Sequence, residues 1–260
     1  MAEKLRLLSL FAGIGGFELG LERSGYFETV AQCEIDPFCR RVLAKHWPNV
    51  RRYEDVRELT AARLAADGVA VDAICGGFPC QDVSVAGRRA GIDAPRSGLW
   101  REYGRIICEV RPRIIFVENV TGLLHNGFGT VLRDLASFGY DAEWHCIPAS
   151  AIGAPHGRDR VWVMAYSQQE QRLCPIFDAD DAAEACRTNA AEWREDGFRF
   201  EMGAARRSVF GRWMDQPDPI RMANGISDWP HRLGGCGNAV VPQIPELLGR
   251  AYGQAMLERH

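Results

Sequence analysis

Two residues that follow apolar runs have side chains suited to covalent chemistry. Cys80 comes shortly after the run Val71 to Ile74, across two glycines and a proline, and Glu118 ends the run that begins at Ile114. In an α/β sheet the carboxyl ends of the strands line the ligand crevice. We expect these two strands to be neighbours, which would bring a thiol beside a carboxylic acid. That pair suits nucleophilic attack with simultaneous protonation of the substrate.

A cysteine alone is weak evidence, because most cysteines of a globular protein are small buried hydrophobes. The chain has nine, an odd number at irregular spacing, and no two are separated by two residues. This pattern argues against a disulfide framework and against a zinc site, so we predict no metal and a reducing, cytoplasmic setting. Cys80 differs from the other cysteines through the glycines before it and the acid at the end of the next strand.

Two arginines form a second candidate group. Arg158 and Arg160 stand immediately before the apolar run that begins at Val161. Residues i and i+2 of a strand share a face, so the pair could hold a base carbonyl and a phosphate. The alternative is a basic pair on the surface.

A glycine turn and two acids indicate a cofactor site. The first apolar run ends in Phe11-Ala12-Gly13-Ile14-Gly15-Gly16, which lets a ligand approach the backbone but lacks the third glycine of the dinucleotide fingerprint. Glu34 ends the second strand, where an acid can bind two ribose hydroxyls, or else be a solvated carboxylate. Asp55 follows the position of the third strand and could accept a hydrogen bond from an adenine amino group. Together these features suit a nucleoside cofactor without a pyrophosphate.

Short apolar runs alternate with amphipathic stretches over residues 1–166, which predicts a doubly wound, mostly parallel sheet of the α/β class. The predicted strands are Leu5–Phe11, Thr29–Cys33, Val71–Ile74, Ile114–Val117, Trp144–Pro148 and Val161–Ala165. The predicted helices are Gly15–Ser24, Pro37–His46, Glu58–Ala66, Leu99–Val110 and Gly129–Phe138.

The composition shifts after Tyr166. Residues 167–220 are charged and carry scattered aromatics, which predicts a small irregular region. Residues 221–260 are predicted to be a C-terminal segment that returns to the first domain. This segment contains an amphipathic helix, Pro242–Glu258. The predicted apolar face of that helix consists of Ile244, Leu247, Leu248, Ala251 and Ala255.

Bulk composition sets broad limits on function. A chain of 260 residues with 47% hydrophobic and 25% charged residues is ordinary for a soluble globular protein. We find neither a run long enough to span a membrane nor a signal peptide at the N-terminus. The net charge of −3 does not point to nucleic acid. The basic residues are nevertheless almost all arginine, with only Lys4 and Lys45 as lysines, which is compatible with DNA contact or with coding bias.

Taken in order, the motifs resemble those of the DNA (cytosine-5)-methyltransferases, over about residues 5–166 and 221–257. The segments that carry the resemblance are Phe11–Gly16, Gly77-Phe78-Pro79-Cys80-Gln81, Glu118-Asn119-Val120, Arg158-Asp159-Arg160 and Gly237-Asn238-Ala239-Val240-Val241-Pro242. The Pro-Cys-Gln and Glu-Asn-Val pair is highly specific for that family, whereas the glycine turn is not. The family fold is the Rossmann-like fold of S-adenosylmethionine-dependent enzymes.

The resemblance implies a cofactor, S-adenosylmethionine, and a mechanism. The cofactor site would comprise Phe11, Gly13, Gly15, Glu34, Ile35, Asp55, Asn238 and Ala239. Cys80 would attack C6 of a cytosine while Glu118 protonates or hydrogen-bonds N3, so that C5 accepts the methyl group. Arg160, supported by Arg158, would hold the base, which must be flipped out of the duplex.

The resemblance also implies double-stranded DNA as the partner, with no membrane, a monomeric enzyme, and a restriction endonuclease as a functional counterpart without contact. Residues 81–98 correspond to a mobile catalytic loop, and residues 167–220 to a short variable target-recognition region. The expected DNA contacts are Arg88, Arg89 and Arg96 in that loop and Arg206, Arg207, Arg212 and Arg221 beyond it. His156 departs from the glutamine that the family often has.

Two other functions stay open at this point. One is methylation of transfer RNA, although the Cys-Phe-Thr tripeptide typical of that branch is absent from the variable region. The other is a catalytically silent DNA-binding homologue, against which the intact Cys80, Glu118 and Arg160 argue.

Overall fold

The computed structural model describes residues 3–79, 98–152, 154, 157–168 and 239–257. Several predicted site residues lie outside these ranges, so their predictions stay as stated. They are Cys80, His156, Asn238, and the arginines at positions Arg88, Arg89, Arg96, Arg206, Arg207, Arg212 and Arg221.

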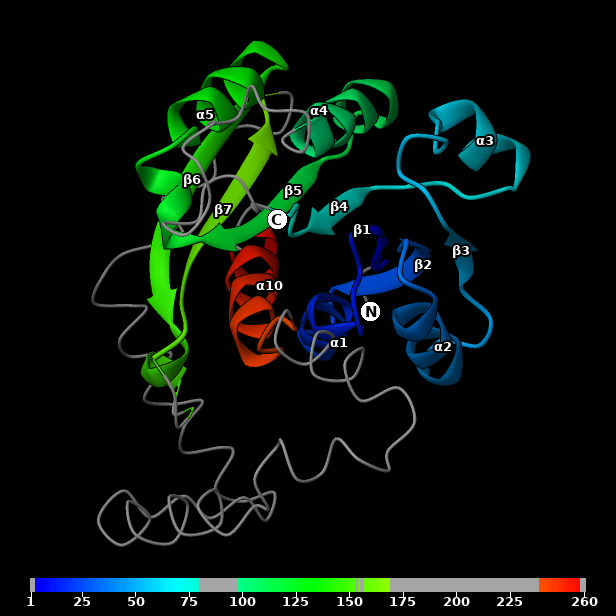
Figure 1. Ribbon diagram of the computed structural model, residues 1–260, viewed down its shortest axis with the longest axis horizontal. Coiled ribbons are helices and arrows are strands. Elements are labelled where there is room, and N and C mark those ends of the chain that lie inside the picture. Colours follow the sequence, from blue (N-terminus) through cyan, green and yellow to red (C-terminus); the bar gives the residue numbers. More distant parts are fainter. Residues whose placement is uncertain (1–2, 80–97, 153, 155–156, 169–238, 258–260) are drawn as a thin grey trace, which may run out of the picture.

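The described chain forms an α/β fold around one seven-stranded sheet with the order β3-β2-β1-β4-β5-β7-β6 (Figure 1). The strands are β1 (Leu5–Leu10), β2 (Phe27–Cys33), β3 (Arg51–Tyr53), β4 (Ala73–Gly76), β5 (Ile114–Val120), β6 (Tyr140–Pro148) and β7 (Asp159–Ser167). Strands β2 and β3 extend the sheet to one side of β1, and β4 and the later strands extend it to the other. Ligands bind in doubly wound folds at the point between β1 and β4 where this strand order reverses. The predicted fold class is therefore confirmed.

Helices cover both faces of this sheet. They are α1 (Gly16–Arg23), α2 (Pro37–His46), α3 (Ala61–Ala66), α4 (Gly98–Val110), α5 (Phe128–Ser137) and α10 (Gln243–Leu257), with short 3₁₀ turns η1 (Thr121–Leu124) and η2 (Ala149–Ile152). Figure 1 shows α1 and α10 together on one side of the strands, and α4 and α5 on the other. None of the helices in the described ranges is both long and apolar enough to cross a membrane.

Local sequence signals explain several helix boundaries. Helix α2 runs as predicted because Asp36 caps its first turn, accepting from the amides of Phe38 at 2.7 Å and Cys39 at 3.1 Å, and because Pro37 suits that turn. Helix α3 begins later than predicted, at Ala61, since Thr60 caps it there.

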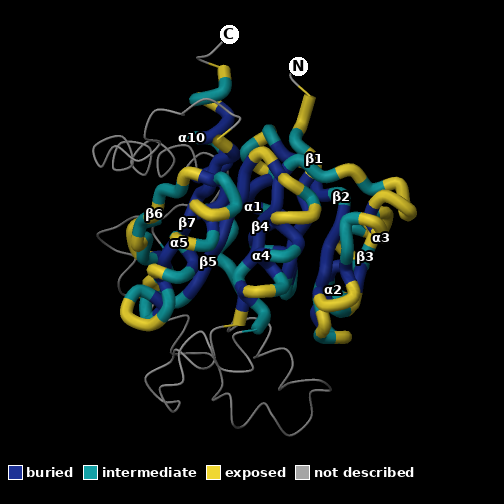
Figure 2. The backbone as a smooth tube through the Cα atoms, turned by 90° about the horizontal axis from the view of Figure 1, so that it is seen from above, coloured by how far each residue is buried: buried dark blue, intermediate teal, exposed yellow. Residues whose placement is uncertain are grey.

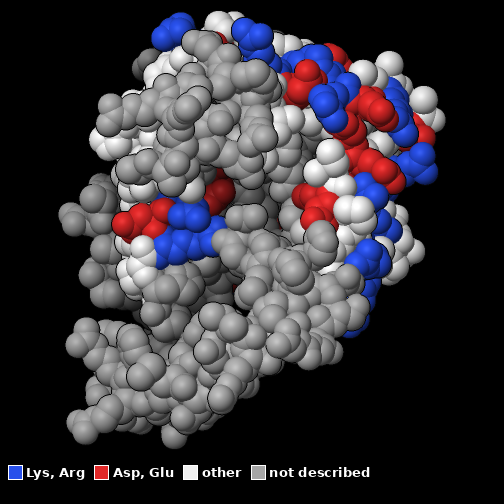
Figure 3. All heavy atoms as spheres, viewed as in Figure 1, with Lys and Arg blue, Asp and Glu red and all other residues white. Residues whose placement is uncertain are grey.

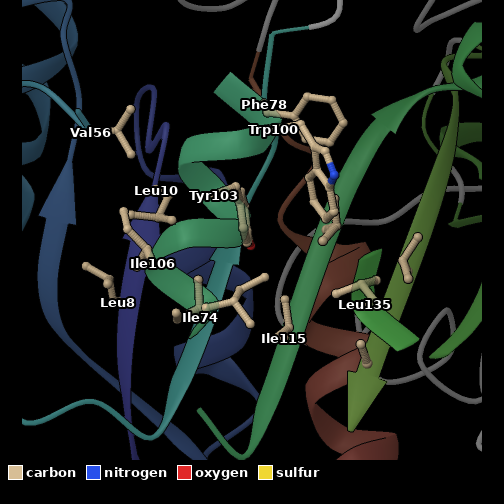
Figure 4. Packing of buried hydrophobic residues seen from close by; sticks show 14 of the residues in the cluster. Leu8, Leu10, Val56, Ile74, Phe78, Trp100, Tyr103, Ile106, Ile115 and Leu135 are labelled. Carbon is tan, nitrogen blue, oxygen red and sulfur yellow. The ribbon is translucent and has the colours of Figure 1, made fainter. Parts of the chain in front are cut away.

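Alternating side chains of the strands fill two separate cores. Leu8, Leu10 and Ile74 point toward α4, whose Trp100 and Tyr103 are buried one turn apart (Figure 4). The opposite side chains pack against α1 and α10. Figure 2 shows that buried residues are concentrated in the strands. Burial on both faces explains why the strands read as continuous apolar runs.

The last two strands make the sheet mostly parallel, as predicted, and supply its antiparallel part. Strand β7 is antiparallel to both β5 and β6, whereas the other pairs are parallel. The connection between β6 and β7 covers only residues 149–158, which is shorter than a crossover helix requires, so β7 returns directly beside its predecessor. As a result β7 begins at the edge of the sheet where β5 ends.

Helix α10 buries part of its predicted face, with Ala255 packed against the core that it shares with α1. Ile244 and Leu248 are buried as expected, but the face continues through Tyr252 and two glycines instead of Leu247 and Ala251. A side-chain carbon on Gly249 would lie 2.7 Å from the Ser24 hydroxyl, and one on Gly253 only 2.2 Å from the Tyr26 ring. Glycines are needed because α10 approaches α1 and its following turn so closely.

Candidate active site

The glycine turn forms one wall of a pocket at the carboxyl edge of β1. Phe11 and Gly13 have positive φ angles of 54° and 56°, and Gly15, with φ 92°, precedes the first residue of α1. The pocket is lined by Ser9, Leu10, Phe11, Ala12, Gly13, Ile14, Gly16, Phe17, Gly76, Gly77, Glu118, Ala239 and Val240. It thus joins the predicted cofactor turn, the predicted acid and the C-terminal segment in a single cavity.

Glu34 is held at the entrance to this turn. Its carboxylate accepts the Gly13 amide at 2.7 Å and the Asp36 amide at 2.8 Å, so it is anchored rather than a solvated strand end. In dinucleotide-binding folds the amides of this turn face phosphate; here a carboxylate takes the Gly13 amide and would repel phosphate. The side chain of Ile35 is 63% exposed. An anchored acid beside an exposed apolar side chain suits a nucleoside without phosphates.

Asp55 follows β3 on the same edge of the sheet and is ion-paired with Arg57. Arg57 donates to it through its backbone amide at 2.9 Å as well as through its guanidinium. Hydrogen bonding to Arg57 lowers the pKa of Asp55, which keeps this carboxylate ionised and able to accept further hydrogen bonds.

The C-terminal segment lines the same pocket as the glycine turn. Ala239 and Val240 line the cavity. A side-chain carbon on Gly16 would lie 2.3 Å from the Val240 carbonyl oxygen, so the two backbones are in direct contact. This contact explains why a glycine is required at the start of α1.

Glu118 is the buried acid of the site. It is 8% exposed, and its Oε1 lies 2.9 Å from Nε of Arg160. Burial raises the pKa of Glu118, and the nearby charges of Arg160 and Arg158 only partly oppose that effect. The carboxyl group is therefore easier to protonate than an ordinary glutamate, as a proton donor requires.

The antiparallel course of β7 brings the two arginines to this acid. Val120 is the register partner of Arg160, so Arg160 reaches back along β5 toward Glu118. Arg158 is half-buried, and its charge also acts on Glu118. The sequence prediction that the pair belongs to the site is consistent with this placement, because the Arg160 side chain is only 20% exposed.

The segment leading to Cys80 is fixed to the strand that carries Glu118. The Asn119 side chain donates to the Phe78 carbonyl oxygen at 3.0 Å and accepts the Val120 amide at 2.9 Å. A side-chain carbon on Gly77 would lie 2.7 Å from Glu118 Oε2. Sequence reasoning found these residues only as parts of motifs. The signal for Asn119 was an amide directly after an acid at the end of a buried strand.

Four of the described cysteines, Cys33, Cys75, Cys108 and Cys146, lack the lowered pKa of an activated thiol. Burial raises the pKa of Cys33 to about 12 and that of Cys75 well above its ordinary value. Cys108 and Cys146 are exposed, yet partial burial raises the pKa of each as well. A reactive thiol needs a lowered pKa, so Cys80 remains the candidate nucleophile.

The described surface carries charges of both signs. Figure 3 shows acidic and basic side chains interspersed over the described part of the viewed face rather than one wide basic field. Binding of a polyanion would then depend on individual arginines.

Comparison with known proteins agrees with this geometry. The family model for C-5 cytosine-specific DNA methylases matches residues 5–194. The chain belongs to the C-5 cytosine-specific DNA methylase family. The Type II methyltransferase M2.BsuMI of Bacillus subtilis is 37% identical over 184 residues, which are 68% of this chain and 45% of that protein. The Type II methyltransferase M.Bsp6I of a Bacillus species is 34% identical over 172 residues, or 64% of this chain and 53% of that protein.

The likeness to these family members has limits of length and identity. The chain spans about half the length of the two curated relatives. A crystal structure of a Spodoptera frugiperda DNMT2 mutant superposes with a TM-score of 0.56 at 22% identity, covering 67% of this chain and 54% of that one. At this identity the superposition supports the methylase fold and no more.

Proposed function

We propose that this protein transfers a methyl group to C5 of cytosine in double-stranded DNA, with S-adenosylmethionine as the methyl donor. The observation that carries the proposal is the buried Glu118 carboxyl. It is paired with Arg160, lies against Gly77, and is joined through Asn119 to the backbone that leads to Cys80. This arrangement places a proton donor beside the backbone that leads to the proposed nucleophile.

In the proposed mechanism Cys80 and Glu118 activate the base together. The Cys80 thiolate forms an S–C6 bond, and the electron pair of the C5–C6 double bond shifts toward C5 as Glu118 gives a proton or hydrogen bond to N3. S-adenosylmethionine, when bound, supplies the methyl group that C5 accepts. Loss of the C5 proton to a base then reforms the double bond and expels the thiolate. Arg160 holds Glu118 and, with Arg158, the cytosine.

The residues around the glycine turn suit this cofactor. Glu34 has lone pairs left to accept from ribose hydroxyls, because each of its carboxylate oxygens accepts from one backbone amide. Asp55, at the neighbouring strand end, would accept from the adenine amino group, and the exposed Ile35 would offer an apolar surface to the ring. The acids also favour a ligand with a positive sulfonium over one with phosphates. Asn238 and Ala239 complete the site in this proposal.

The target base has to leave the duplex, since a stacked cytosine cannot reach a buried acid. The arginines of residues 81–98 and of the variable region are proposed to bind phosphates. The curated relatives are named Type II methyltransferases. We infer that this chain acts as a monomer, with a restriction endonuclease of the same specificity as a functional counterpart that it does not contact.

The test uses the Cys80→Ala variant and a trapping substrate. The wild-type chain should transfer labelled methyl groups to duplex DNA and not to transfer RNA, whereas Cys80→Ala should bind the cofactor near normally and transfer none. Duplex DNA with 5-fluorocytosine at the target should form a covalent adduct. C5 then carries fluorine in place of the proton that a base must remove to release the thiolate. Turnover by Cys80→Ala, or methylation without adduct formation, would refute the covalent mechanism.

A further inference from the structure

A tryptophan outside the recognised motifs packs directly against the cofactor turn. A side-chain carbon on Gly15 would lie 2.3 Å and 2.6 Å from two ring carbons of Trp47, and 3.1 Å from Leu43. Gly15 is the one residue of the turn from Phe11 to Gly16 that does not line the pocket. The Trp47 ring therefore contacts the turn on the side away from the pocket.

The Trp47 ring is itself held in place by an acid of α1. Its indole nitrogen donates to both carboxylate oxygens of Glu22, at 3.0 Å each. Trp47 is the C-cap residue of α2. Its backbone amide donates to the Leu43 carbonyl oxygen at 2.8 Å, and its own carbonyl oxygen accepts from the Arg52 side chain at 2.6 Å. Backbone and side chain are thus both fixed, so the ring is a rigid support.

Glu22 also joins this support to the sheet. Its Oε1 accepts the amide of Thr29 at 3.1 Å. Thr29 lies at an irregularity of register, because β1 pairs Leu7 with Thr29 but Leu8 with Ala31. A bulge leaves a backbone group without its ladder partner, and Glu22 supplies that partner. The acid therefore ties α1, β2 and the Trp47 ring together.

We propose that Trp47, oriented by Glu22, is a positioning residue for cofactor binding: it presses on Gly15 and holds the turn in the left-handed conformation that shapes the pocket. The inference rests on the proposed function, because it names what holds the cofactor site of that function. Trp47 does not touch the reacting atoms. Its loss should weaken binding of the cofactor while turnover at saturating cofactor stays the same.

The experiment measures binding of S-adenosylmethionine by calorimetry, and KM for cofactor, KM for DNA and kcat, on the full chain. The variants are Trp47→Ala, Trp47→Phe and Glu22→Gln, with Trp144→Ala as a matched control, since Trp144 is a partly exposed tryptophan on the edge strand β6. Unfolding midpoints are recorded for every variant, and binding is measured well below them.

We expect Trp47→Ala to raise the Kd and KM for cofactor by about tenfold or more, with kcat and the KM for DNA within about twofold of wild type. Trp47→Phe keeps an aromatic ring but lacks the outer indole carbons at Gly15 and the nitrogen that binds Glu22, so Trp47→Phe and Glu22→Gln should both give an intermediate loss of affinity. The Trp144→Ala control should bind like wild type. If Trp47→Ala does not fold, the Trp47→Phe and Glu22→Gln variants carry the same test.

Cofactor affinity within twofold of wild type in all of the Trp47 and Glu22 variants overturns the inference while leaving the proposed function intact. Equal losses of cofactor and DNA binding also overturn it, because they indicate a general structural role. A wild-type chain that binds cofactor but methylates no DNA refutes the proposed function alone, and the calorimetric comparison still decides the role of Trp47. A wild-type chain that binds no S-adenosylmethionine refutes both.

Discussion

Replacing Glu18 by glutamine should stabilise this protein, and more strongly as the pH rises. Glu18 is fully buried on α1, where its Oε1 accepts from the Gln32 side chain at 3.3 Å. Ser9 and Gln32 are register partners across β1 and β2, and Cys75 flanks Ser9 from β4. Among the described residues, Glu18 Oε2 and Gln32 Oε1 are buried oxygens without a hydrogen-bond partner. An ionised carboxylate is therefore poorly compensated there.

The size of the effect follows from the pKa. Burial, partly opposed by neighbouring hydrogen-bond donors, raises the pKa of Glu18 from 4.5 to about 7. An acid with a raised pKa binds its proton more tightly in the folded state, so its contribution to stability is full below the unfolded pKa and is lost as the pH rises toward 7. A shift of about 2.5 units corresponds to about 3 kcal/mol of lost stability above pH 7. Glutamine is neutral at every pH and escapes this loss.

The assay is urea unfolding of the wild type and Glu18→Gln at several values from about pH 5 to about pH 8. The stability advantage of the variant over the wild type should grow by about 2–3 kcal/mol across that range. Other titrating groups cancel in the difference, because both proteins contain them. Glu28→Gln serves as the matched control for the loss of one carboxylate, since Glu28 is exposed on β2.

An advantage that stays constant between the two ends of the pH range would refute the reasoning. It would mean that Glu18 has the same proton affinity in the folded and unfolded chains. A variant that is less stable than the wild type at the alkaline end would show instead that the ionised carboxylate is stabilising.

Three further results are expected from the site itself. Glu34→Ala should weaken cofactor binding by on the order of 1.5–3 kcal/mol, measured by calorimetry, and unchanged affinity would show that Glu34 only ties the glycine turn to β2. Gly77→Ala should lower kcat by about a hundredfold with normal folding by circular dichroism, because its new carbon displaces the Glu118 carboxylate; normal turnover would contradict the placement of that acid. Replacing Arg206 and Arg207 together by alanine should weaken DNA binding and flatten its salt dependence by roughly one to two units of slope. An unchanged slope and methylation pattern would place the DNA-reading surface elsewhere.

The sequence by itself determined the local elements and the motifs at their ends. Helix α2 was predictable to the residue, because an aspartate cap and a proline define its first turn through contacts only a few residues long. The neighbouring ends of β4 and β5 followed from the rule that doubly wound sheets gather strand ends at one edge. Cys80 and Glu118 could be paired in function for the same reason.

Only the tertiary structure decided how distant segments meet. The direction of β7 places Arg160 on Glu118, and the strand's own alternation of side chains does not reveal its direction. The burial of the Glu18 carboxyl group could not be predicted either. A glutamate in an amphipathic helix is expected to face solvent until the contacts of that helix with β1 and β2 are known. The Trp47 ring meets Gly15 only because α2 packs beside α1. Short-range steric and hydrogen-bonding preferences are written in neighbouring residues, whereas burial, register and charge pairing depend on which surfaces the completed sheet brings together.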